Sequence, residues 1–467
     1  MSDAPATPAA AAVQTALSRS LRSRHVAMIT IGGIIGAGLF VGSSVAIAAA
    51  GPAIIVSYAL TGLLILLIMR MLGEMAIDMP RVHSFTEFTR VALGNWAGFS
   101  VGWLYWYFWA VVIPVEAIAG ATILQRWLPL PMWEIGTVLM LIMTCVNLMS
   151  ARAYGEFEFW FASIKVVAII VFIVVVGAHA CGFRSPTGPT FSTLIDYGGF
   201  APRGPFAVLA AVTTVIWSMM GAEVVTIAAA ESPEPARAVA RMTSTIITRI
   251  LLFYVGSIFV IVSTVPWTHV VSGQSPFTLA LDGIGFPYAS DFMAGVVLTA
   301  VLSCLNSSFY VASRVLFVLA SRGDAPRWLV RTNRRHVPAR AVLLASAVGF
   351  AGVIAAILSP SVVFAFLVNA SGAIIAMIYL AIAVSEVRWR RARERAGEPP
   401  PTLPMWLFPW LSYLAMAGML LVLIAMALTP THRAEFWTST ISIAVALLAY
   451  VFRRGRAGAV STLHAAR

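Results

Sequence analysis

The sequence predicts an all-α integral membrane protein with about twelve transmembrane helices. Sixty per cent of its 467 residues are hydrophobic and only 11% are charged, a balance far from that of soluble domains. A transmembrane helix needs roughly 20 mostly apolar residues, and the chain contains many such runs. Its 3 cysteines have no metal-ligand spacing, so neither a disulfide framework nor a metal site is expected.

The expected helices follow one another along most of the chain, separated by short polar segments. Their approximate ranges are 26–49, 52–72, 96–124, 132–150, 158–179, 206–230, 245–265, 290–319, 341–358, 361–385, 407–428 and 436–452.

The distribution of arginines predicts the orientation in the membrane. If both termini are cytoplasmic, only four arginines fall on the outer side: Arg126, Arg184, Arg203 and Arg433. The densest clusters, Arg314 to Arg340 and Arg388 to Arg395, lie in predicted cytoplasmic loops. The net charge of +12 therefore favours anionic lipid headgroups as partners. Nucleic acid is a poor alternative, because the arginines are divided among many short loops.

Lys165 is the only lysine of the chain, and it lies within the apolar run Phe159–Phe172. A charge at the bilayer centre costs roughly 3 kcal/mol, so an ionisable residue there is a functional candidate. Lysine can lose its proton when desolvated, whereas arginine hardly can. Lys165 is therefore a candidate proton carrier. The alternatives are an ammonium group that reaches the interface or one that holds a static ion pair.

The first and sixth expected helices both contain helix-weakening residues. Four glycines lie between Gly32 and Gly38, and each weakens a helix by about 1 kcal/mol relative to Ala. They indicate either close helix packing or an unwound stretch that lines a cavity. Trp217–Glu223 combines a glycine, a hydroxyl and a carboxylate in the sixth helix. Interruptions at matching positions of two halves are typical of the midplane site of a secondary transporter. Such a site suits a zwitterion, because half-helix N-termini attract carboxylates.

Several motifs occur in a characteristic order: Gly33–Phe40, Ala50–Tyr58 followed by Gly73–Glu74, Gly221–Glu223, Ala228–Pro233 and Ser321–Pro326. Together they resemble the amino acid permease family of the amino acid–polyamine–organocation superfamily, over nearly the whole chain. Four further stretches resemble the bacterial 4-aminobutyrate (GABA) permeases of that family: Ser43–Ala48, Val112–Ala117, Tyr154–Trp160 and Ser371–Ile374. Trp217 departs from the pattern, in which Phe is expected, and its larger ring would narrow the pocket or the gate.

The resemblance implies a 5+5 inverted repeat with broken helices 1 and 6, plus two extra C-terminal helices. The corresponding segments are a cytoplasmic N-terminal tail (1–25), the first repeat (26–179), the second repeat (206–385), helices eleven and twelve (407–453) and a cytoplasmic C-terminal tail (454–467).

The resemblance also implies a substrate site between the broken helices. Backbone groups of helix one would bind the substrate carboxylate, and helix six would supply carbonyls and an aromatic lid. These residues are Ile34, Gly36, Ala37 and Gly38 in helix one, and Trp217, Ser218 and Met220 in helix six.

In proton-driven members of the family, a fifth-helix lysine occupies the place of a sodium ion, and Lys165 falls on that position. Its ammonium group would bridge carbonyls of helix one and hydroxyls of helix eight, for which Ser307 and Ser308 are the candidates. The implied coupling ion is a proton, with no metal or organic cofactor.

Two carboxylates inside expected helices have alternative roles. Glu116 lies mid-helix, where its charge needs a partner, either a substrate amine or backbone and hydroxyl groups. Glu223 adjoins the break of helix six and either gates the pathway or caps the broken segment. The aromatic run Trp103–Trp109 covers every face of its helix, and we interpret it as packing.

These expectations predict a secondary active transporter that imports GABA or a related small amino acid across the bacterial inner membrane, by proton symport with alternating access. The alternatives are a permease for an aromatic, proline or basic α-amino acid, and an amino acid exchanger. An enzyme would need a nucleophile, an acid–base pair or a metal cluster, and the sequence suggests none.

Overall fold

The computed structural model describes most of the chain, and the described part is built of helices connected by turns. The described residues are 25–29, 35–36, 38–79, 84–186, 188–230, 237–239, 250–272, 274–358, 363, 367, 371, 373–430 and 432–465.

Seven helical segments among these residues have the length and apolar composition of a membrane span. They are Gly38–Asp78, which contains α3 (Ser43–Ala50) and α4 (Ile54–Asp78), then α6 (Asn95–Leu124), α7 (Met132–Met149), α8 (Ala151–Ala180), α14 (Ala289–Ser321), α18 (Trp410–Leu428) and the part Arg433–Arg453 of α19 (Arg433–Ala465). Shorter apolar helical segments are α9 (Gly204–Ser218), Leu252–Thr264, which contains α12 (Ser257–Thr264), and α15 (Ala339–Ala355). The predicted class, an all-helical protein with several membrane spans, is confirmed.

Four further helices complete the main elements: α5 (Phe85–Leu93), α10 (Val224–Ala230), α13 (Pro276–Gly283) and α17 (Ile374–Arg395). The helices α5 and α13 lie in segments that the sequence did not predict to be helical. The predicted range 361–385 overlaps α17, but most of 359–372 lies outside the described residues.

Two arginine clusters that were predicted to be loops are partly helical. The cluster Arg388–Arg395 belongs to α17, because Arg, Ala and Glu are strong helix formers even outside an apolar run. Arg314 lies inside α14 and is 3% exposed. Its guanidinium carbon lies 4.1 Å from the ring centroid of Tyr310, a cation–π contact that compensates a buried charge.

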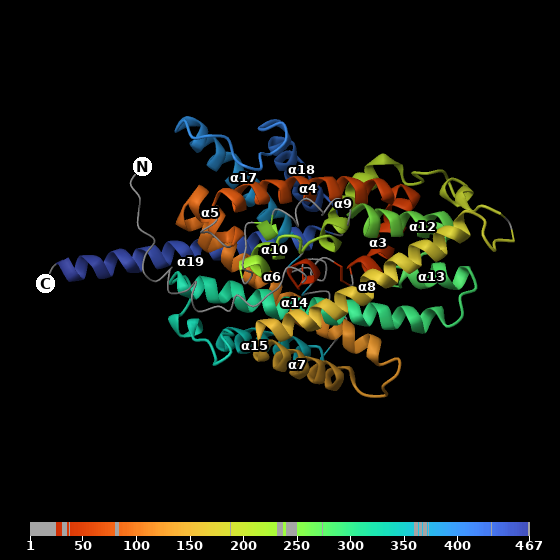
Figure 1. Ribbon diagram of the computed structural model, residues 1–467, viewed down its shortest axis with the longest axis horizontal. Coiled ribbons are helices and arrows are strands. Elements are labelled where there is room, and N and C mark those ends of the chain that lie inside the picture. Colours follow the sequence, from red (N-terminus) through yellow and green to blue (C-terminus); the bar gives the residue numbers. More distant parts are fainter. Residues whose placement is uncertain are drawn as a thin grey trace.

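Helices α6 and α14 pack against each other in the interior of the bundle, and α8 covers α14 from the outside. Two glycines of α6 allow α14 to approach closely: a Cβ at Gly102 would lie 2.7 Å from Leu319, and one at Gly120 would lie 3.3 Å from Val301. Helix α8 packs on another face of α14, where the rings of Tyr154 and Tyr310 stack with centroids 4.2 Å apart. Helix α8 lies beside α14 over part of its length (Figure 1), so polar side chains of the two helices can meet.

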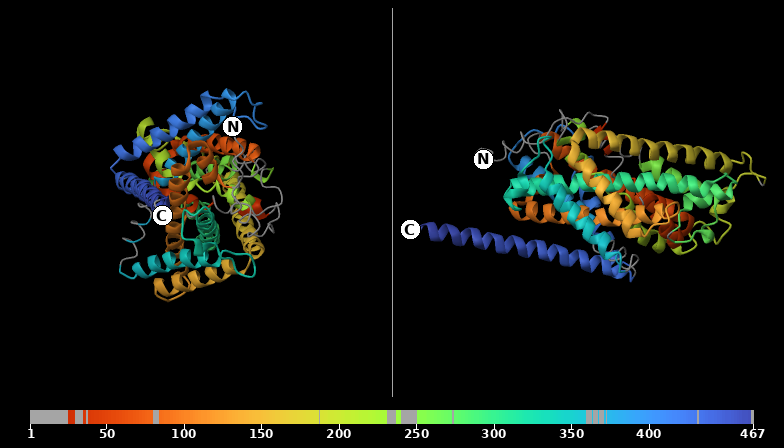
Figure 2. Two further views of the ribbon diagram at one scale, coloured as in Figure 1. Left: turned by 90° about the vertical axis from the view of Figure 1, so that its left-hand side faces the viewer. Right: turned by 90° about the horizontal axis from the view of Figure 1, so that it is seen from below.

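The last helix differs from the others in its reach. Figures 1 and 2 show α19 continuing well beyond the rest of the bundle. Its residue Arg453 still contacts the bundle, with the guanidinium carbon 5.5 Å from the ring centroid of Phe99 in α6.

Candidate substrate and ion site

The sixth expected helix is interrupted, as the sequence predicted. Helix α9 ends at Ser218 and α10 begins at Val224. Gly221 lies between them with φ of +103°, a conformation that glycine adopts without steric cost. Its amide donates to Glu223 Oε2 over 3.2 Å. The break therefore interrupts the regular backbone hydrogen bonds of the helix between Met219 and Ala222.

The first expected helix is also irregular where it meets the sixth. Ile35 and Gly36 lie in a bend, and the π-helical turn Gly38–Gly42 leads into α3. A Cβ at Gly38 would lie 2.8 Å from the Ser218 Cα and 3.3 Å from the Trp217 ring. The two interruptions are therefore in direct contact. The predicted site residues Ile34 and Ala37 lie outside the described residues.

Glu116 of α6 lies beside the bend in helix one. A Cβ at Gly36 would lie 3.7 Å from Glu116 Oε1 and 3.4 Å from Cys304 Sγ of α14. Glu116 is only 4% exposed, yet its Oε2 has no hydrogen-bond partner among the described residues. Nε1 of Trp217 is also a buried atom without a hydrogen-bond partner among the described residues. Buried polar atoms are normally hydrogen-bonded, so these two atoms are suited to a polar ligand.

Lys165 of α8 connects helix one with α14. Its side chain is fully buried, so its ammonium group does not reach the interface. Nζ donates to the Ile35 carbonyl over 2.6 Å and to Ser303 Oγ over 2.9 Å. The lysine thus binds a carbonyl of broken helix one and a hydroxyl of α14, the two kinds of partner that the resemblance implied.

The hydroxyl that accepts the hydrogen bond from Lys165 belongs to Ser303. Ser303 lies about one helical turn before the predicted residues Ser307 and Ser308. The Ser307 hydroxyl lies 3.2 Å from the hydroxyl of Tyr154, and Ser308 donates to the Cys304 carbonyl over 2.7 Å. Ser303 and Ser307 share one face of α14, because residues four apart lie above one another on a helix. The position of α8 along α14 and the rotation of the two helices determine which of them meets the lysine.

Glu158 of α8 is a member of this site that we did not predict. It is fully buried; its Oε1 accepts from the Ser303 hydroxyl, and its Oε2 accepts from Asn306 Nδ2 over 3.2 Å. Glu158 precedes Lys165 by seven residues, which is close to two helical turns and puts both on one face. Two opposite charges at this spacing in an apolar helix are the signal that would have identified it.

Glu223, at the helix-six break, is held by two other helices. Its carboxylate accepts from Tyr105 of α6 over 3.0 Å and from Tyr379 of α17 over 2.7 Å, in addition to the Gly221 amide. Tyr105 belongs to the aromatic run that we interpreted as packing, so that interpretation missed the role of its hydroxyl. The carboxylate both caps the break and links three elements, which keeps the capping and gating roles open.

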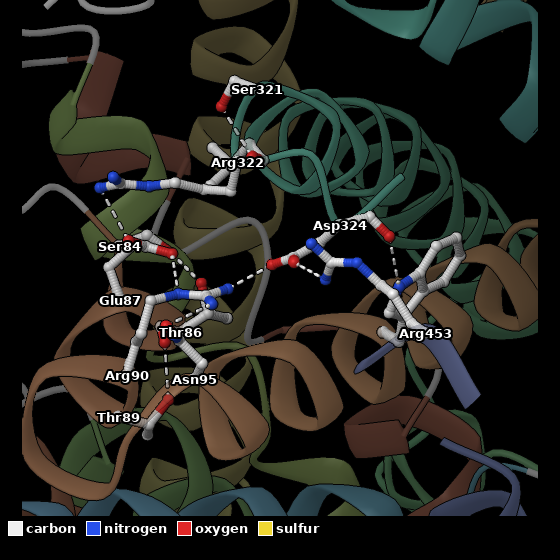
Figure 3. Close-up of polar contacts among 12 residues, drawn as sticks. Ser84, Thr86, Glu87, Thr89, Arg90, Asn95, Ser321, Arg322, Asp324 and Arg453 are labelled. Carbon is white, nitrogen blue, oxygen red and sulfur yellow. Dashed lines mark hydrogen bonds and ion pairs between the residues drawn. The ribbon is translucent and has the colours of Figure 1, made fainter. Parts of the chain in front are cut away.

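A second group of charges, which we call the Asp324 cluster, lies between α5, the end of α14 and α19. It consists of Glu87, Arg90, Arg322, Asp324 and Arg453. Figure 3 shows Arg90 and Arg453 approaching the Asp324 carboxylate from opposite sides. Glu87 pairs with Arg90 at 3.1 Å and with Arg322 at 2.8 Å. Burial by itself would lower the pKa of Arg90, but the charges of Glu87 and Asp324 outweigh it and raise that pKa.

No group of three or more His, Cys, Asp or Glu side chains in the described part of the chain has an arrangement that would hold a metal ion. The polar side chains of the central site are instead hydroxyls, amides, phenols, carboxylates and one ammonium.

Comparison with known proteins identifies the family of this chain. The sequence profile of the family described as "Amino acid permease" matches residues 25–454. The chain belongs to the amino acid permease family. It is therefore a transporter and not an enzyme. The "Gamma-aminobutyric acid permease" of Bacillus subtilis is 44% identical over 94% of this chain and 95% of its own length.

Other relatives are named for more than one kind of substrate. The "Gamma-aminobutyric acid permease" of Escherichia coli is 45% identical over 90% of each chain. The "Aromatic amino acid transport protein AroP" of Escherichia coli is 35% identical over 95% of this permease and 97% of its own length. The higher identity to the two GABA permeases agrees with the motifs noted in the sequence.

Proposed function

We propose that this permease imports GABA or a related small amino acid by proton symport with alternating access. The observation that carries the proposal is the contact of the two helix interruptions at Gly38 and Ser218. In the same region, Oε2 of Glu116 has no hydrogen-bond partner among the described residues. Backbone groups of two broken helices suit a zwitterion, and the relatives named as GABA permeases favour GABA among zwitterions.

In this proposal the head group of the substrate is bound by backbone. Amides of helix one bind the carboxylate, and helix six contributes carbonyls together with the Trp217 ring as a lid. The residues concerned are Ile34, Gly36, Ala37 and Gly38, and Trp217, Ser218 and Met220. Tyr254 donates to the Ser218 carbonyl over 2.9 Å, which supports the broken segment from the η4 turn (Ile250–Gly256).

The amine of GABA needs a partner farther from the carboxylate than an α-amine does. Glu116 fits this role, because its carboxylate is buried, lies beside Gly36 and has one oxygen without a partner among the described residues. A charge-assisted hydrogen bond between ammonium and carboxylate is about twice as strong as a neutral one. We therefore assign Glu116 to the amine.

Proton coupling is assigned to Lys165 in the same proposal. When protonated, its ammonium holds the Ile35 carbonyl and Ser303 together, which ties helix one to α14. Loss of the proton weakens this tie, and the broken helix can then move. Ser307 and Ser308 lie on the same helix and complete the predicted hydroxyl set. Glu223, bound by Tyr105 and Tyr379, acts as a gate.

The proposed topology has twelve helices in two inverted five-helix repeats, 26–179 and 206–385, followed by helices eleven and twelve within 407–453. Both tails, 1–25 and 454–467, are cytoplasmic, and the protein resides in the bacterial inner membrane. The arginines support this orientation through the positive-inside rule, and they would contact anionic lipids.

Uptake of labelled GABA into proteoliposomes with an imposed inward proton gradient tests the proposal. Accumulation that collapses with a protonophore is the expected result. Accumulation of an aromatic, proline or basic amino acid but not GABA would overturn the substrate assignment. Exchange of GABA without any response to the proton gradient would overturn symport and identify an exchanger.

A further inference from the structure

We propose that Ser303 and Glu158 form a proton relay that discharges Lys165 toward the N-terminal end of α8. The inference rests on the proposed proton symport, and it names the route by which the proton leaves the site. In the proposed topology, the N-terminal end of α8 faces the cytoplasm.

The three polar groups are linked by two consecutive hydrogen bonds. Lys165 Nζ donates to Ser303 Oγ over 2.9 Å, and the same hydroxyl donates to Glu158 Oε1. All three side chains are fully buried. The serine hydroxyl therefore accepts from the lysine and donates to the glutamate, which is the arrangement that a proton transfer between them requires.

The transfer balances without any added group. The ammonium of Lys165 gives one proton to the Ser303 oxygen while the hydroxyl of Ser303 gives its own proton to the Glu158 carboxylate. Lys165 becomes a neutral amine, Glu158 a neutral carboxylic acid, and Ser303 is unchanged. Both buried charges disappear together, so the step never leaves one of them unpaired, which is the costly situation for a buried pair.

The position of Glu158 gives the relay a direction. Its backbone lies seven residues before that of Lys165 on α8, about 10 Å closer to the N-terminal end at 1.5 Å per residue, and the two side chains extend toward each other to meet Ser303. A proton that reaches Glu158 has crossed two hydrogen bonds, roughly 5 Å, and is then held by the residue whose backbone lies nearer the N-terminal end of α8. When that end of the protein opens to water, Glu158 releases the proton and its carboxylate is restored.

Two asparagines fix the orientation of the Glu158 carboxylate. Asn147 of α7 donates to Asn306 Oδ1 over 3.0 Å, and Asn306 donates to Glu158 Oε2 over 3.2 Å. Because Asn147 engages the carbonyl end of the Asn306 amide, the amino end is directed at Glu158. One carboxylate oxygen is thereby held by the amide, and the other remains directed at Ser303.

Other titratable groups surround the relay. Glu116 of α6 and Cys304 of α14 act electrostatically on Lys165 together with Glu158. Tyr154 of α8 and Tyr310 of α14 stack one turn below Glu158. Glu156, two residues before Glu158 on α8, pairs with His25 at 3.1 Å. Among these groups, Glu116 and Glu158 are the two carboxylates that act on Lys165, so a test must separate them.

The decisive test compares two transport modes of reconstituted protein. Counterflow, with GABA on both sides, needs no net proton transfer, whereas GABA-induced proton uptake reported by an internal pH dye does. For Ser303→Ala we expect proton uptake to fall by about tenfold or more, a barrier change of roughly 1.4 kcal/mol, and counterflow to fall by much less, because counterflow needs no proton release. Ser303→Thr, which keeps a hydroxyl, should restore coupling.

Thr299→Val serves as the matched control, because the Thr299 hydroxyl of α14 donates to the Val296 carbonyl of its own helix. It should leave both modes unchanged. Glu158→Gln is the second variant and should reproduce the Ser303→Ala pattern, while Glu116→Gln should instead weaken GABA binding in both modes.

Normal proton uptake in both folded Ser303→Ala and folded Glu158→Gln would overturn the relay. Equal loss of counterflow and proton uptake in folded Ser303→Ala would also overturn it, since a residue that only positions Lys165 would behave in that way. If wild-type protein performs counterflow without proton uptake, the proposed symport itself fails, and the relay fails with it.

Discussion

The permease contains two charge clusters that are built differently. In the Asp324 cluster, every carboxylate meets arginine: Asp324 meets Arg90 and Arg453, and Glu87 meets Arg90 and Arg322. In the central site, a single lysine and its neighbouring glutamate are joined through a serine hydroxyl. Arginine does not lose its proton in proteins, whereas lysine does. The Asp324 cluster is therefore suited to holding α5, α14 and α19 together permanently. The central site is suited to a change in the charge of Lys165.

Their hydrogen-bonding differs in the same sense. Both oxygens of Asp324 have an arginine partner, so the cluster is complete without a ligand. Glu116 in the central site has an oxygen without a partner among the described residues. An incompletely satisfied buried group destabilises the fold, and such groups concentrate at functional sites. The comparison predicts that changes in the centre affect transport and that changes in the Asp324 cluster affect stability.

The largest effect is expected from Lys165→Arg. Arg stays charged, so the variant should lose proton-driven accumulation by roughly 100-fold, about 2.7 kcal/mol in barrier terms. The pH dependence of transport should disappear with it. Uptake under an imposed proton gradient, measured across a pH series, checks this. Normal proton-driven accumulation in the variant would contradict the coupling role.

Gly38→Ala should have the next largest effect. The added methyl would lie 2.8 Å from the Ser218 backbone, and overpacking of this kind costs about 1–3 kcal/mol. We expect roughly tenfold lower uptake per folded molecule. The control is Gly295→Ala, because a Cβ at Gly295 would meet nothing within 4 Å. If Gly38→Ala takes up GABA at the wild-type rate, the close contact of Gly38 with Ser218 is not needed for transport.

Glu116→Gln should weaken GABA uptake by about tenfold, equivalent to roughly 1.4 kcal/mol, through a higher KM. The neutral amide replaces the charge that faces the amine. The control is Glu134→Gln in the first turn of α7, which should leave KM unchanged. Labelled uptake and the amount of folded protein are measured together, since equal losses in both would remove the case for direct amine contact.

Asp324→Asn should have the smallest effect on transport. It removes one charge from an aspartate that is 7% exposed and should lower stability by about 1–2 kcal/mol, with uptake per folded molecule nearly unchanged. Asp291→Asn is the control, because Asp291 and its partner Arg126 are both about half exposed; such a pair contributes about 0–1 kcal/mol. Thermal unfolding of Asp324→Asn and Asp291→Asn measures the difference in stability. A clear loss of uptake per folded molecule in Asp324→Asn would contradict the structural role of the Asp324 cluster.

Features that depend on one segment were predictable. Hydropathy indicated the apolar helices, since each must match a bilayer thickness. A glycine, a hydroxyl and a carboxylate between Trp217 and Glu223 indicated the break that the structure has between Ser218 and Val224. An isolated lysine in an apolar run indicated Lys165 as a buried charge. The continuation of α17 to Arg395 was missed, because a charged helix has no apolar periodicity to reveal it.

The tertiary structure decided which of these side chains meet. The position of α8 along α14 decides which serine accepts the hydrogen bond from Lys165. A displacement of one helical turn would replace Ser303 by Ser307. The contact of Tyr105 and Tyr379 with Glu223 likewise joins residues from three separate helices. The sequence alone determined the helical membrane class, the family motifs and the intramembrane positions of Lys165 and Glu116, because these follow from local composition. The pairing of those charges depends on rotation and translation between helices, which local composition does not encode.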